Sequence, residues 1–496
     1  MKTQVLIVGA GPVGLTMAME LARYGVSVRI VDKAAQRTDK SKAIVLWSRT
    51  LELLDRAGCT GDFVTVGHKV LAANIIASRQ LMAHVDFTGV DSPHPYALMI
   101  PQSDTERLLE EQLERLGVTA ERRTEVSSFA QGARGVTAAV RDESGLEEVI
   151  EADWLIGCDG AHSVVRHGLG LPFDGDTMQT DWILADLHLR GYPLPETEMA
   201  TYWHEDGVLL MIPLSATRFR VIADLGPSSG GSAVTPTLDR VQAIIDHRGP
   251  GGMIAADPIW LSGFRINERK VNDYRSGRVF VAGDAAHIHS PAGGQGMNTG
   301  MQDAFNLAWK LALVCKGEAA ETLLDSYSVE RSAVGDQVLK AAGHLTMIAT
   351  MRNHTAQAVR NLFGRILLGL NPVRRAMVNN MAEISVGYDH SPLNGASIHN
   401  AVCAPGHRLA PVDGRIPAGS GSKPRFAVFA ASKSDVRALA GSLPGLVDHT
   451  IRPPVDANAI VLVRPDGYVA CVAKSGDVDA IKRYLGAIAV TEKAAA

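Results

Sequence analysis

The hydrophobic pattern begins with a short apolar run that leads directly into a glycine-rich turn. Residues 5–8 are all apolar, which is typical of a strand buried on both faces of a parallel sheet. Residues 15–24 then follow helical spacing, and a second apolar run over residues 26–31 stops at Asp32. This order predicts a strand, a turn, a helix and a second parallel strand, which together form the first unit of an α/β fold.

Two later apolar runs end in the same way as the first. Residues 154–156 lead into Asp159 and Gly160, and residues 279–282 lead into a glycine followed by Asp284. In open parallel sheets, ligands bind at the edge formed by the carboxyl ends of the strands. We therefore expect three segments that are distant in the sequence to bring glycine and aspartate residues to one edge of a single sheet.

The hydrophobic pattern changes in the middle of the chain and again near its C-terminal end. Residues 176–262 alternate between apolar and polar positions, which predicts an antiparallel sheet with one covered face, and residues 71–98 are expected to add strands to it. After a Gly/Pro/Ser-rich connector, the order strand, helix, strand, strand, helix predicts a small thioredoxin-like domain. The predicted domains are a Rossmann-type dinucleotide-binding domain (1–70, 99–175 and 263–340), an inserted antiparallel-sheet domain for the substrate (71–98 and 176–262), a helical segment (341–390) and a thioredoxin-like domain (391–496).

Composition and charge exclude several classes of protein. Hydrophobic residues make up 46% of the chain and charged residues 21%, so the chain can bury a sizeable core. The net charge of −4 and the lack of a long basic run speak against nucleic acid or an anionic membrane surface as the partner. The five cysteines are scattered and form no CxxC pair, so we expect reduced thiols in a cytoplasmic protein. Glycines and a proline interrupt the uncharged run over residues 3–19, so no stable membrane insertion is expected.

The turn after the first strand has the sequence GAGPVG, which matches the GxGxxG pattern of dinucleotide-binding turns. In this pattern Gly9 allows the tight turn, Gly11 lets the backbone approach a pyrophosphate, and Gly14 lets the helix pack closely on the strand. The start of the helix, which includes Pro12 and Val13, offers free N–H groups and a partial positive charge to a phosphate.

Asp32 stands at the end of the second strand, where an acidic side chain accepts hydrogen bonds from a ribose diol. A carboxylate there would repel a 2′-phosphate, so the site suits FAD or NAD better than NADP. One NAD needs only one strand–turn–helix unit, whereas FAD is longer and has a flavin ring to hold. Three convergent strand ends therefore favour FAD. Because the chain has no second GxGxxG unit, we expect NAD(P)H to dock only transiently.

Three motifs in a fixed order resemble one enzyme family. They are GxGxxG at residues 9–14, DGAHSVVR at residues 159–166 and GDAAHIHSPAGGQGMNTGMQDAFNLAWKL at residues 283–311. Over about residues 1–390 the chain is similar to the class A FAD-dependent aromatic hydroxylases, which have the para-hydroxybenzoate hydroxylase fold. The C-terminal part resembles the thioredoxin-like extension of the phenol and polyketide hydroxylase branches.

The resemblance implies an activity and its partners. The expected enzyme is an FAD-dependent monooxygenase that uses NAD(P)H and O₂ to hydroxylate a phenolic or other aromatic substrate through a flavin C4a-hydroperoxide. The first predicted domain is then an FAD-binding domain. The C-terminal domain is expected to serve stability or association, which allows a homodimer.

The resemblance also places cofactor contacts along the chain. Asp284 is expected on the ribityl chain of the flavin, and the glycine-rich loop after Pro291 is expected to lie against the flavin ring. The helix that begins near Asn298 would aim its positive end at the pyrimidine edge, where reduced flavin carries negative charge. Lys42 stands where relatives often carry arginine, so it keeps the charge but lacks the bidentate fork. The expected cofactor-binding residues are Gly9, Gly11, Pro12, Val13, Gly14, Asp32, Lys33, Lys42, Arg49, Gln102, Val126, Asp159, Gly160, Asp284, Pro291, Gly294, Gly296, Met297 and Asn298.

Substrate contacts and metal ligands are less defined by the sequence. No acid–base residue is identifiable from spacing, and core packing is the stronger expectation for the candidates that lie on strands. His287 and His289 form an HxH pair that can bind a metal together with Asp284, but no other cysteine or histidine cluster lies nearby, so no metal is expected. The candidate substrate residues are Tyr202, Trp203, His204, Met211, Pro213 and His289.

Two other functions remain open at this point. An epoxidase or a reductase can be built on the same scaffold, whereas a halogenase is disfavoured because the tryptophans form no WxWxIP segment. A flavin-bound sensor without turnover would instead use its C-terminal domain to recruit a partner.

Overall fold

The strand that opens the chain lies at the centre of the nucleotide-binding sheet. The computed structural model describes residues 2–39, 41–228, 230–231, 234–412 and 414–490. In it β1 (Lys2–Val8) pairs in parallel with β2 (Val28–Val31) on one side and with β10 (Glu147–Gly157) on the other, and β10 pairs in parallel with β17 (Val279–Val281). The register places Val8 opposite Gly157, and Gly157 opposite Val281. Three strand ends that are far apart in the sequence therefore lie side by side, as the sequence predicts.

Antiparallel strands and helices complete this first layer. The same sheet contains β8 (Glu125–Gly132), β9 (Gly135–Arg141) and β16 (Arg275–Ser276), all paired antiparallel. A small separate sheet joins β3 (Val45–Leu46), β7 (Ala97–Met99) and β4 (His68–Val70). The shorter helices of this region are α2 (Ser48–Ala57), α3 (Thr60–Val66), α5 (Val164–Gly168), η1 (Gly283–Ala285), η2 (Ala292–Gly294) and η3 (Glu321–Leu324).

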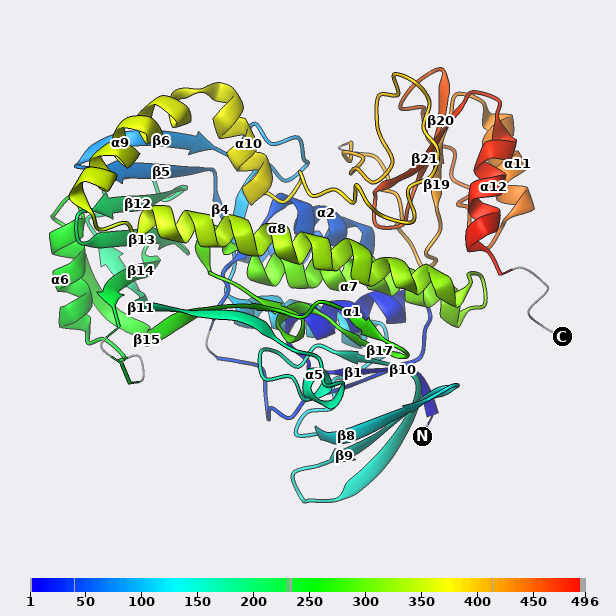
Figure 1. Ribbon diagram of the computed structural model, residues 1–496, viewed down its shortest axis with the longest axis horizontal. Coiled ribbons are helices and arrows are strands. Elements are labelled where there is room, and N and C mark those ends of the chain that lie inside the picture. Colours follow the sequence, from blue (N-terminus) through cyan, green and yellow to red (C-terminus); the bar gives the residue numbers. More distant parts are fainter. Residues whose placement is uncertain (1, 40, 229, 232–233, 413, 491–496) are drawn as a thin grey trace.

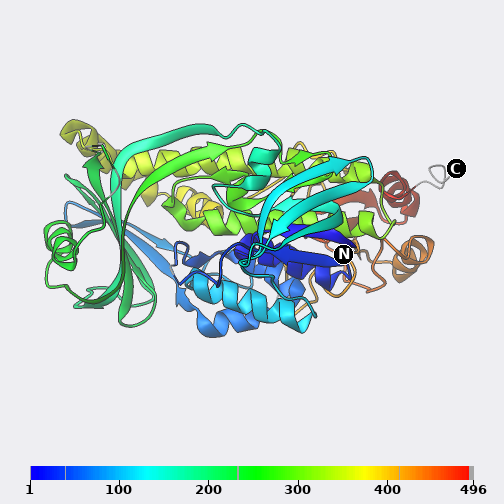
Figure 2. The same ribbon diagram turned by 90° about the horizontal axis from the view of Figure 1, so that it is seen from below.

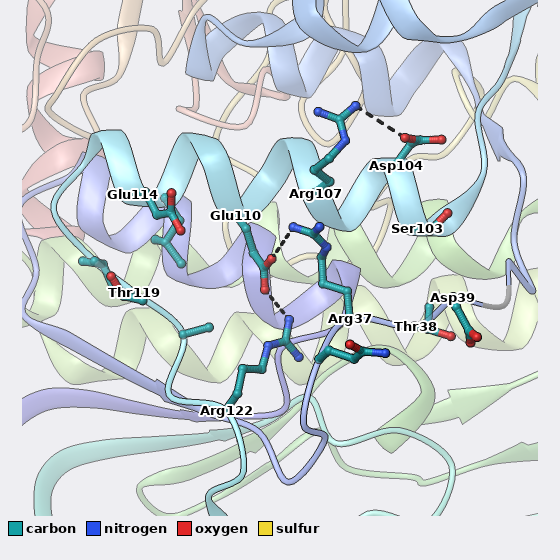
Figure 3. A pocket seen from close by; sticks show the side chains of 14 residues that line it. Arg37, Thr38, Asp39, Ser103, Asp104, Arg107, Glu110, Glu114, Thr119 and Arg122 are labelled. Atoms are coloured by element: carbon teal, nitrogen blue, oxygen red, sulfur yellow. Dashed lines mark hydrogen bonds and ion pairs between the residues drawn. The ribbon is translucent and has the colours of Figure 1, made fainter.

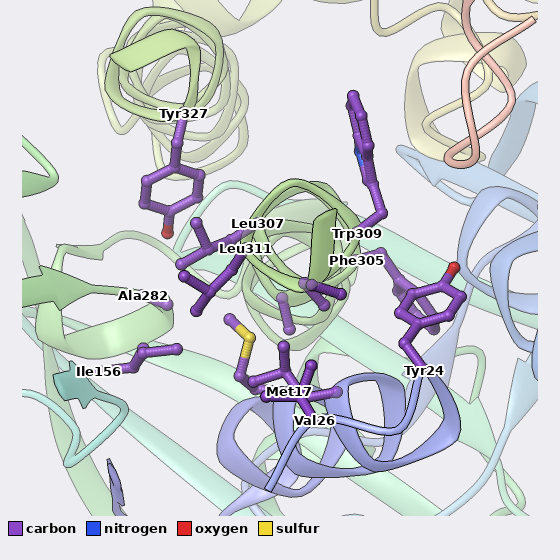
Figure 4. Packing of buried hydrophobic residues seen from close by; sticks show 14 of the residues in the cluster. Met17, Tyr24, Val26, Ile156, Ala282, Phe305, Leu307, Trp309, Leu311 and Tyr327 are labelled. Carbon is purple, nitrogen blue, oxygen red and sulfur yellow. The ribbon is translucent and has the colours of Figure 1, made fainter. Parts of the chain in front are cut away.

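Helices α1 (Pro12–Arg23) and α7 (Gly296–Cys315) form the core of the molecule beside this sheet. Every residue of α7 from Asn298 to Leu313 is buried, which is typical of a helix with neighbours on all sides. Figure 4 shows α7 between α1 and α8 (Asp325–Ala349), with apolar side chains from all three filling the space. α4 (Gln102–Arg115) packs on the other side of α1. None of the described helices combines the length and the apolar character needed to cross a lipid bilayer.

The alternating region forms an eight-stranded sheet. Its strand order is β18-β15-β11-β14-β13-β12-β5-β6, and residues 71–98 join it through β5 and β6, as expected. One pairing differs from the predicted antiparallel pattern, because β12 and β5 are parallel. The strands are β5 (Ala72–Ala77), β6 (Gln80–Asp86), β11 (Asp174–Arg190), β12 (Glu198–His204), β13 (Gly207–Pro213), β14 (Arg218–Pro227), β15 (Ile254–Lys270) and β18 (His287–Ile288).

Two faces of this sheet have different neighbours. The outer face packs on α6 (Leu238–Arg248) and includes Ile183 and Val221. The inner face carries Trp182 and Ile222, the alternate residues of the same strands, together with side chains such as Ala349 from the end of α8. At the far edge, α9 (His354–Gly369) and α10 (Asn371–Met381) lie over β5 and β6 (Figure 1).

The C-terminal domain lies at the opposite end of the molecule from the eight-stranded sheet (Figures 1 and 2). It consists of β19 (Ala427–Phe429), α11 (Lys433–Ser442), β20 (Ala459–Val463), β21 (Val469–Lys474) and α12 (Val478–Ile488), in the predicted order. The three strands form one antiparallel sheet. The last part of the predicted domain, residues 491–496, lies outside the described residues.

Candidate cofactor and active site

The glycine turn after β1 has the close contacts that its sequence predicts. Gly9 has φ +102°, and a Cβ there would lie 2.4 Å from the carbonyl oxygen of Cys158. A Cβ at Gly14 would lie 1.9 Å from the carbonyl oxygen of Gly9, so α1 approaches the turn as closely as backbone allows. A Cβ at Gly11 would meet nothing within 4 Å, and no side chain caps α1, whose first turn carries Pro12. Open space next to free N–H groups fits a pyrophosphate.

A cavity of about 230 Å³ lies where the ends of β1, β2 and β10 meet. Seven residues that the sequence predicts for the cofactor line it together, although they come from four separate segments. The sequence did not single out its other lining residues as cofactor contacts. Three of them lie next to predicted sites, because Thr124 and Glu125 precede Val126 and His162 lies in the DGAHS motif. The predicted lining residues are Gly9, Gly11, Asp32, Lys33, Val126, Asp159 and Gly160, and the others are Val8, Val31, Thr124, Glu125, Cys158, His162 and Val164.

Backbone N–H groups hold the carboxylate of Asp32 in this cavity. Asp32 accepts from Ala10 N–H at 2.6 Å and from Ala34 N–H at 2.7 Å, and Arg122 lies 3.5 Å away. A carboxylate has about four acceptor positions, so Asp32 retains capacity for a ribose hydroxyl.

Asp159 has a structural role that the sequence does not predict. Its carboxylate accepts from the Ser163 hydroxyl and from the N–H groups of Val164 and Val165 at 2.7 and 3.2 Å. These bonds hold the start of α5, so the Asp159 side chain shapes the cavity wall while its backbone lines the cavity.

A carboxylate without a hydrogen-bond partner lies at the end of β17. Asp284 is exposed to solvent, and no hydrogen bond to its side chain is found among the described residues. Desolvation by the protein around its carboxylate raises the pKa of Asp284, and the nearby His287 and Lys42 oppose this rise. Lys42 itself is exposed. A carboxylate that is open to a ligand and flanked by a cation fits hydroxyl donors of a ribityl chain.

The turn that carries Asp284 is fixed by a buried neighbour. The Asp303 carboxylate accepts from Gly283 N–H at 3.0 Å, from His287 Nε2 at 2.8 Å and from Arg331 Nε at 2.7 Å. A Cβ at Gly283, which has φ +60°, would lie 2.7 Å from Val13. Val13 therefore acts by packing between the two glycine turns.

The glycine-rich loop after Pro291 packs against β3, a contact that the sequence did not predict. A Cβ at Gly294 would lie 2.4 Å from a methyl group of Val45. The side-chain amide of Asn298 donates to the carbonyls of Val45 and Gly294 at 2.9 and 3.0 Å and accepts from Trp47 N–H at 2.9 Å. Both N–H donors of the Asn298 side chain are thus used within the protein, so the backbone of Asn298 is the better candidate for a cofactor contact. Pro291 and Gly296 adjoin this loop, and Met297 packs partly against the core.

The structure corrects the prediction for Arg49. Its guanidinium is fully buried, donates to Glu52 at 3.1 Å and to the carbonyl of Asp466 at 2.7 Å, and lies over the ring of Tyr468. Arg49 therefore contacts the C-terminal domain and not the cofactor cavity. The side chain of Gln102 is also engaged locally, with Ala43 N–H at 3.3 Å and Glu106 at 2.9 Å.

Most of the predicted substrate residues lie on the wrong face of the eight-stranded sheet. Tyr202 and Met211 are buried in the outer cluster against α6, and Pro213 shares that face by alternation along β13. The His204 ring lies tilted against the ring of His247 of α6. Residues two apart point to the same side of a strand, so the alternation shows two faces but does not say which one faces the cofactor.

Trp203 is the strand candidate that does lie on the inner face, where the guanidinium of Arg360 covers it at 4.6 Å. This face also carries aromatic side chains that the sequence analysis missed, namely Trp182, Trp260 and Phe264. The inner face adjoins the FAD-binding domain, because Arg220 of β14 donates to the backbone carbonyls of Ser41 and Lys42. Trp182 stacks on Phe264, and its indole N–H is buried with no hydrogen-bond partner among the described residues.

His289 is a neutral histidine at the start of α7. Its Nδ1 lies 2.8 Å from the carbonyl oxygen of Ser290, and because a carbonyl only accepts, Nδ1 carries the proton and Nε2 the lone pair. Burial, together with His287, lowers the pKa of His289 to about 4. Nε2 is buried and has no hydrogen-bond partner within the described part of the chain. It faces Gly296, where a Cβ would lie 3.6 Å away.

A larger hollow of about 530 Å³ borders α4 and the loop after β2. Figure 3 shows Arg37 and Arg122 pointing at Glu110 from two sides, and Arg107 pointing at Asp104. Because its arginines are paired with carboxylates in this way, the hollow lacks the excess positive charge of a phosphate site. Arg122 connects it to the cofactor cavity through its contact with Asp32 described above.

A buried charged cluster joins the C-terminal domain to α7 and α8. Arg464 donates two hydrogen bonds to the Glu330 carboxylate at 2.6 and 3.0 Å, and Lys310 donates to it at 2.8 Å. Arg464 also binds Asp466. Burial alone would raise the pKa of Glu330, but Arg464 and Lys310 outweigh it and hold that pKa well below its usual range. Burial lowers the pKa of Lys310 to about 8, although Glu330 opposes this shift.

Comparison with known proteins agrees with this geometry. Residues 2–342 match the family described as FAD binding domain, and residues 454–493 match the family described as phenol hydroxylase, C-terminal dimerisation domain. The chain is 38% identical over 416 residues to a 6-methylpretetramide 4-monooxygenase of Streptomyces rimosus. The aligned region covers 82% of this chain and 74% of that protein. The chain is also 32% identical over 521 residues to a 12-dehydrotetracycline 5-monooxygenase/anhydrotetracycline 6-monooxygenase of Streptomyces rimosus subsp. rimosus. That aligned region covers 98% of this chain and 99% of that protein. Among solved structures, the anhydrotetracycline hydroxylase OxyS of Streptomyces rimosus has a TM-score of 0.81 at 29% identity, with 98% of this chain and 99% of that chain covered.

Proposed function

The chain belongs to the FAD-binding family of aromatic monooxygenases, and from this premise we propose that its substrate is a polycyclic phenol of the polyketide class. The chain is an FAD-dependent monooxygenase, and NAD(P)H is the reductant typical of its relatives. Two observations support the finer proposal. Relatives that match over most of their length carry names of tetracycline-type substrates, and the inner face of the sheet presents Trp182, Trp260 and Phe264 together.

We propose that FAD lies along the three strand ends. Its adenosine and pyrophosphate would occupy the cavity that contains Gly11 and Asp32, and its ribityl chain would bind Asp284. The start of α7, at Gly296, would then face the flavin ring. When bound, FAD supplies hydride acceptance and the activation of dioxygen. The protein supplies position and a dry, preorganised environment.

His289 is proposed to accept a hydrogen bond from the substrate hydroxyl. Its free Nε2 lone pair can accept a hydrogen bond from a phenolic hydroxyl, which would orient the ring and make it more electron-rich at the position to be hydroxylated. The unpaired indole N–H of Trp182 is a second candidate contact, since it can donate to a carbonyl or phenolate oxygen of the substrate. Trp203 on the same face adds apolar contact.

The C-terminal match to a dimerisation domain supports the further proposal that two copies of this chain associate as a homodimer through residues 454–493. Light scattering of the purified protein over a concentration series would test this. A mass equal to that of one chain at all concentrations would contradict it.

The proposed activity is tested by aerobic turnover. The purified protein with FAD is incubated with NADPH or NADH and a panel that contains simple phenols and tetracycline- or angucycline-type polycyclic phenols. We expect cofactor oxidation to be stimulated most by a polycyclic phenol, and mass spectrometry to show a product with one added oxygen atom. Stimulation only by single-ring phenols would refute the substrate class, while flavin reduction without an oxygenated product would refute hydroxylation.

The role of His289 is tested separately with His289→Gln and His289→Phe. Both variants remove the imidazole, but glutamine retains a hydrogen-bond acceptor. We expect His289→Phe to lose more kcat than His289→Gln, and the low-pH limb of the kcat profile to change in both. Identical kcat and pH profiles in all three proteins would show that His289 does not touch the substrate.

A further inference from the structure

Three metal-ligating side chains meet at the outer end of the eight-stranded sheet, far in sequence from the FAD-binding motifs. His204 ends β12, Asp206 lies in the turn to β13, and His247 lies in the last turn of α6. The rings of the two histidines are 4.7 Å apart between centroids. One potential ligand atom from each residue lies within 4.8 Å of the others.

The three ligand atoms are His204 Nδ1, Asp206 Oδ2 and His247 Nε2. Asp206 Oδ2 lies 2.7 Å from His247 Nε2 and 3.6 Å from His204 Nδ1. In a tetrahedral site with bonds of about 2.0–2.2 Å, ligand atoms lie about 3.3 Å apart. Small side-chain rotations would therefore bring the three atoms onto one ion. Such rotations are easy because the Asp206 and His247 side chains are 56% and 59% exposed.

The hydrogen bonds of this cluster show what a bound ion would replace. The lone pair of His204 Nδ1 accepts from the backbone N–H of Asp206 at 3.2 Å, and an ion on Nδ1 would take the place of this bond. His247 Nε2 donates its proton to the Asp206 carboxylate at 2.7 Å, so a bound ion would take the place of this proton, and His247 would then carry its proton on Nδ1. Neutral imidazole and ionised carboxylate are the forms that bind metals.

The surrounding charges also allow a cation at this place. His247 lies at the C-terminal end of α6, where the helix dipole favours positive charge. Arg248 is the nearest competing cation, but its guanidinium donates to the carbonyls of Val208 and Asp224 and lies 3.4 Å from the Asp224 carboxylate. The guanidinium also donates to the backbone carbonyl of Asp206 at 2.8 Å, so Arg248 lies beside the cluster, and the Asp224 carboxylate offsets its charge.

We propose that His204, Asp206 and His247 form a binding site for one divalent transition-metal ion of the zinc type. Two imidazoles and one carboxylate favour zinc, copper or nickel over magnesium and calcium, which prefer oxygen ligands. Three protein ligands leave at least one coordination position for water. The ion would link the β12–β13 turn to α6, which packs on the outer face of the substrate sheet through Val241 and Ile245.

A metal at this site would stabilise the folded protein. Any ion that binds the folded state and not the unfolded chain raises the melting temperature by mass action. The site lies on the outer face, so the flavin and substrate contacts of the inner face are not its ligands. Its predicted effect is therefore on the stability of the sheet and is independent of the hydroxylation proposed above.

The test uses Zn²⁺ and Co²⁺ on the FAD-loaded protein. Isothermal titration with Zn²⁺ should give one equivalent in the wild type, and Co²⁺ should give the visible absorption of a low-coordinate nitrogen–oxygen site. We expect His204→Ala and His247→Ala each to weaken Zn²⁺ binding by at least about tenfold and to abolish the rise in melting temperature. The matched control is His407→Ala, because His407 forms another exposed His–Asp pair, 3.3 Å from Asp389, for which the described residues offer no third ligand.

Two outcomes would overturn the proposal. One is a wild-type protein that binds no Zn²⁺ in titration and shows no Co²⁺ absorption. The other is Zn²⁺ binding that is equal in the wild type and in both site variants, which would place the ion elsewhere. Because neither readout involves turnover, loss of the proposed hydroxylase activity would not affect either result.

Discussion

Glu383 offers a direct test of how burial controls ionisation beside the flavin-facing helix. Its side chain is almost fully buried, and it accepts hydrogen bonds from Thr299 at 3.2 Å and from Gln302, both in the first turns of α7. Burial raises the pKa of Glu383 to about 8, although Arg331 and these hydrogen bonds oppose the rise. The Glu383 carboxyl is therefore protonated in the folded protein at neutral pH, whereas in the unfolded chain it ionises near pH 4.5.

The sign of the resulting pH effect follows from proton uptake. Between pH 4.5 and 8 the folded state holds a proton on Glu383 that the unfolded state has lost, so stability falls as pH rises through this window. A shift of about 3.5 units at about 1.4 kcal/mol per unit corresponds to roughly 5 kcal/mol across the window. With an unfolding entropy of about 2 cal/mol/K per residue, this corresponds to a change in melting temperature of roughly 5 °C for a chain that unfolds cooperatively.

The perturbation is Glu383→Gln, which keeps a hydrogen-bond acceptor for α7 but cannot ionise. Melting temperatures of both proteins are measured at half-unit steps from pH 5 to pH 8.5. We expect similar values at pH 5 and a higher value for the variant at pH 8.5. Glu143→Gln is the control, since Glu143 is exposed and should give a difference from the wild type that does not vary with pH. Parallel curves for the wild type and Glu383→Gln would refute the reasoning, because Glu383 would then ionise alike in the folded and unfolded states.

Three further predictions concern the cofactor turns and the C-terminal domain. Gly14→Ala should lose bound FAD, measured as the ratio of flavin to protein absorbance, because its Cβ would lie 1.9 Å from a backbone carbonyl; Gly89→Ala, with nothing within 4 Å, should keep its colour. Asp284→Asn should weaken FAD binding to the apoprotein by roughly 10- to 100-fold, as expected for the loss of charge-assisted hydrogen bonds, and an unchanged affinity in a fluorescence titration would contradict that contact. Arg464→Met should lower the free energy of unfolding by about 3–5 kcal/mol, because Glu330 loses a buried partner, and the double variant with Glu330→Met should recover part of this loss in urea denaturation.

The sequence predicts the convergence of the strand ends well, because each of the elements involved is locally encoded. An apolar run followed by glycine defines a strand end, and parallel pairing then brings such ends together without further information. Gly9, Gly14 and Asp32 could therefore be placed before the structure was known. The helical segment, the order of the C-terminal elements and the membership of residues 71–98 in the second sheet follow from local patterns in the same way.

The errors all concern contacts between distant segments. The partner of Arg49 lies 417 residues away, at Asp466, and no local pattern can reveal it. The alternation of the eight-stranded sheet is equally clear on both faces, so the sequence could not show that Tyr202 lies on the outer face, which α6 covers, and Trp182 on the inner face. The roles of the polar residues within α7 could not be predicted from the sequence either. Asp303, for example, accepts a hydrogen bond from Arg331, which lies on another helix.

The length of β11 and β15 limits how the two halves of the active site can move. These strands have 17 residues each and pair from Asp174–Lys270, next to the nucleotide-binding sheet, to Arg190–Ile254 at the outer end. In the described part of the chain, this long strand pair links the nucleotide-binding sheet to the outer end of the eight-stranded sheet. Its ladder is interrupted only at two register irregularities, so a free hinge is not available along it. Any change in the space between these two regions must come from twisting of the paired strands β11 and β15. We expect this twisting to be largest at the two register irregularities, near residues 177–181 and 186–188.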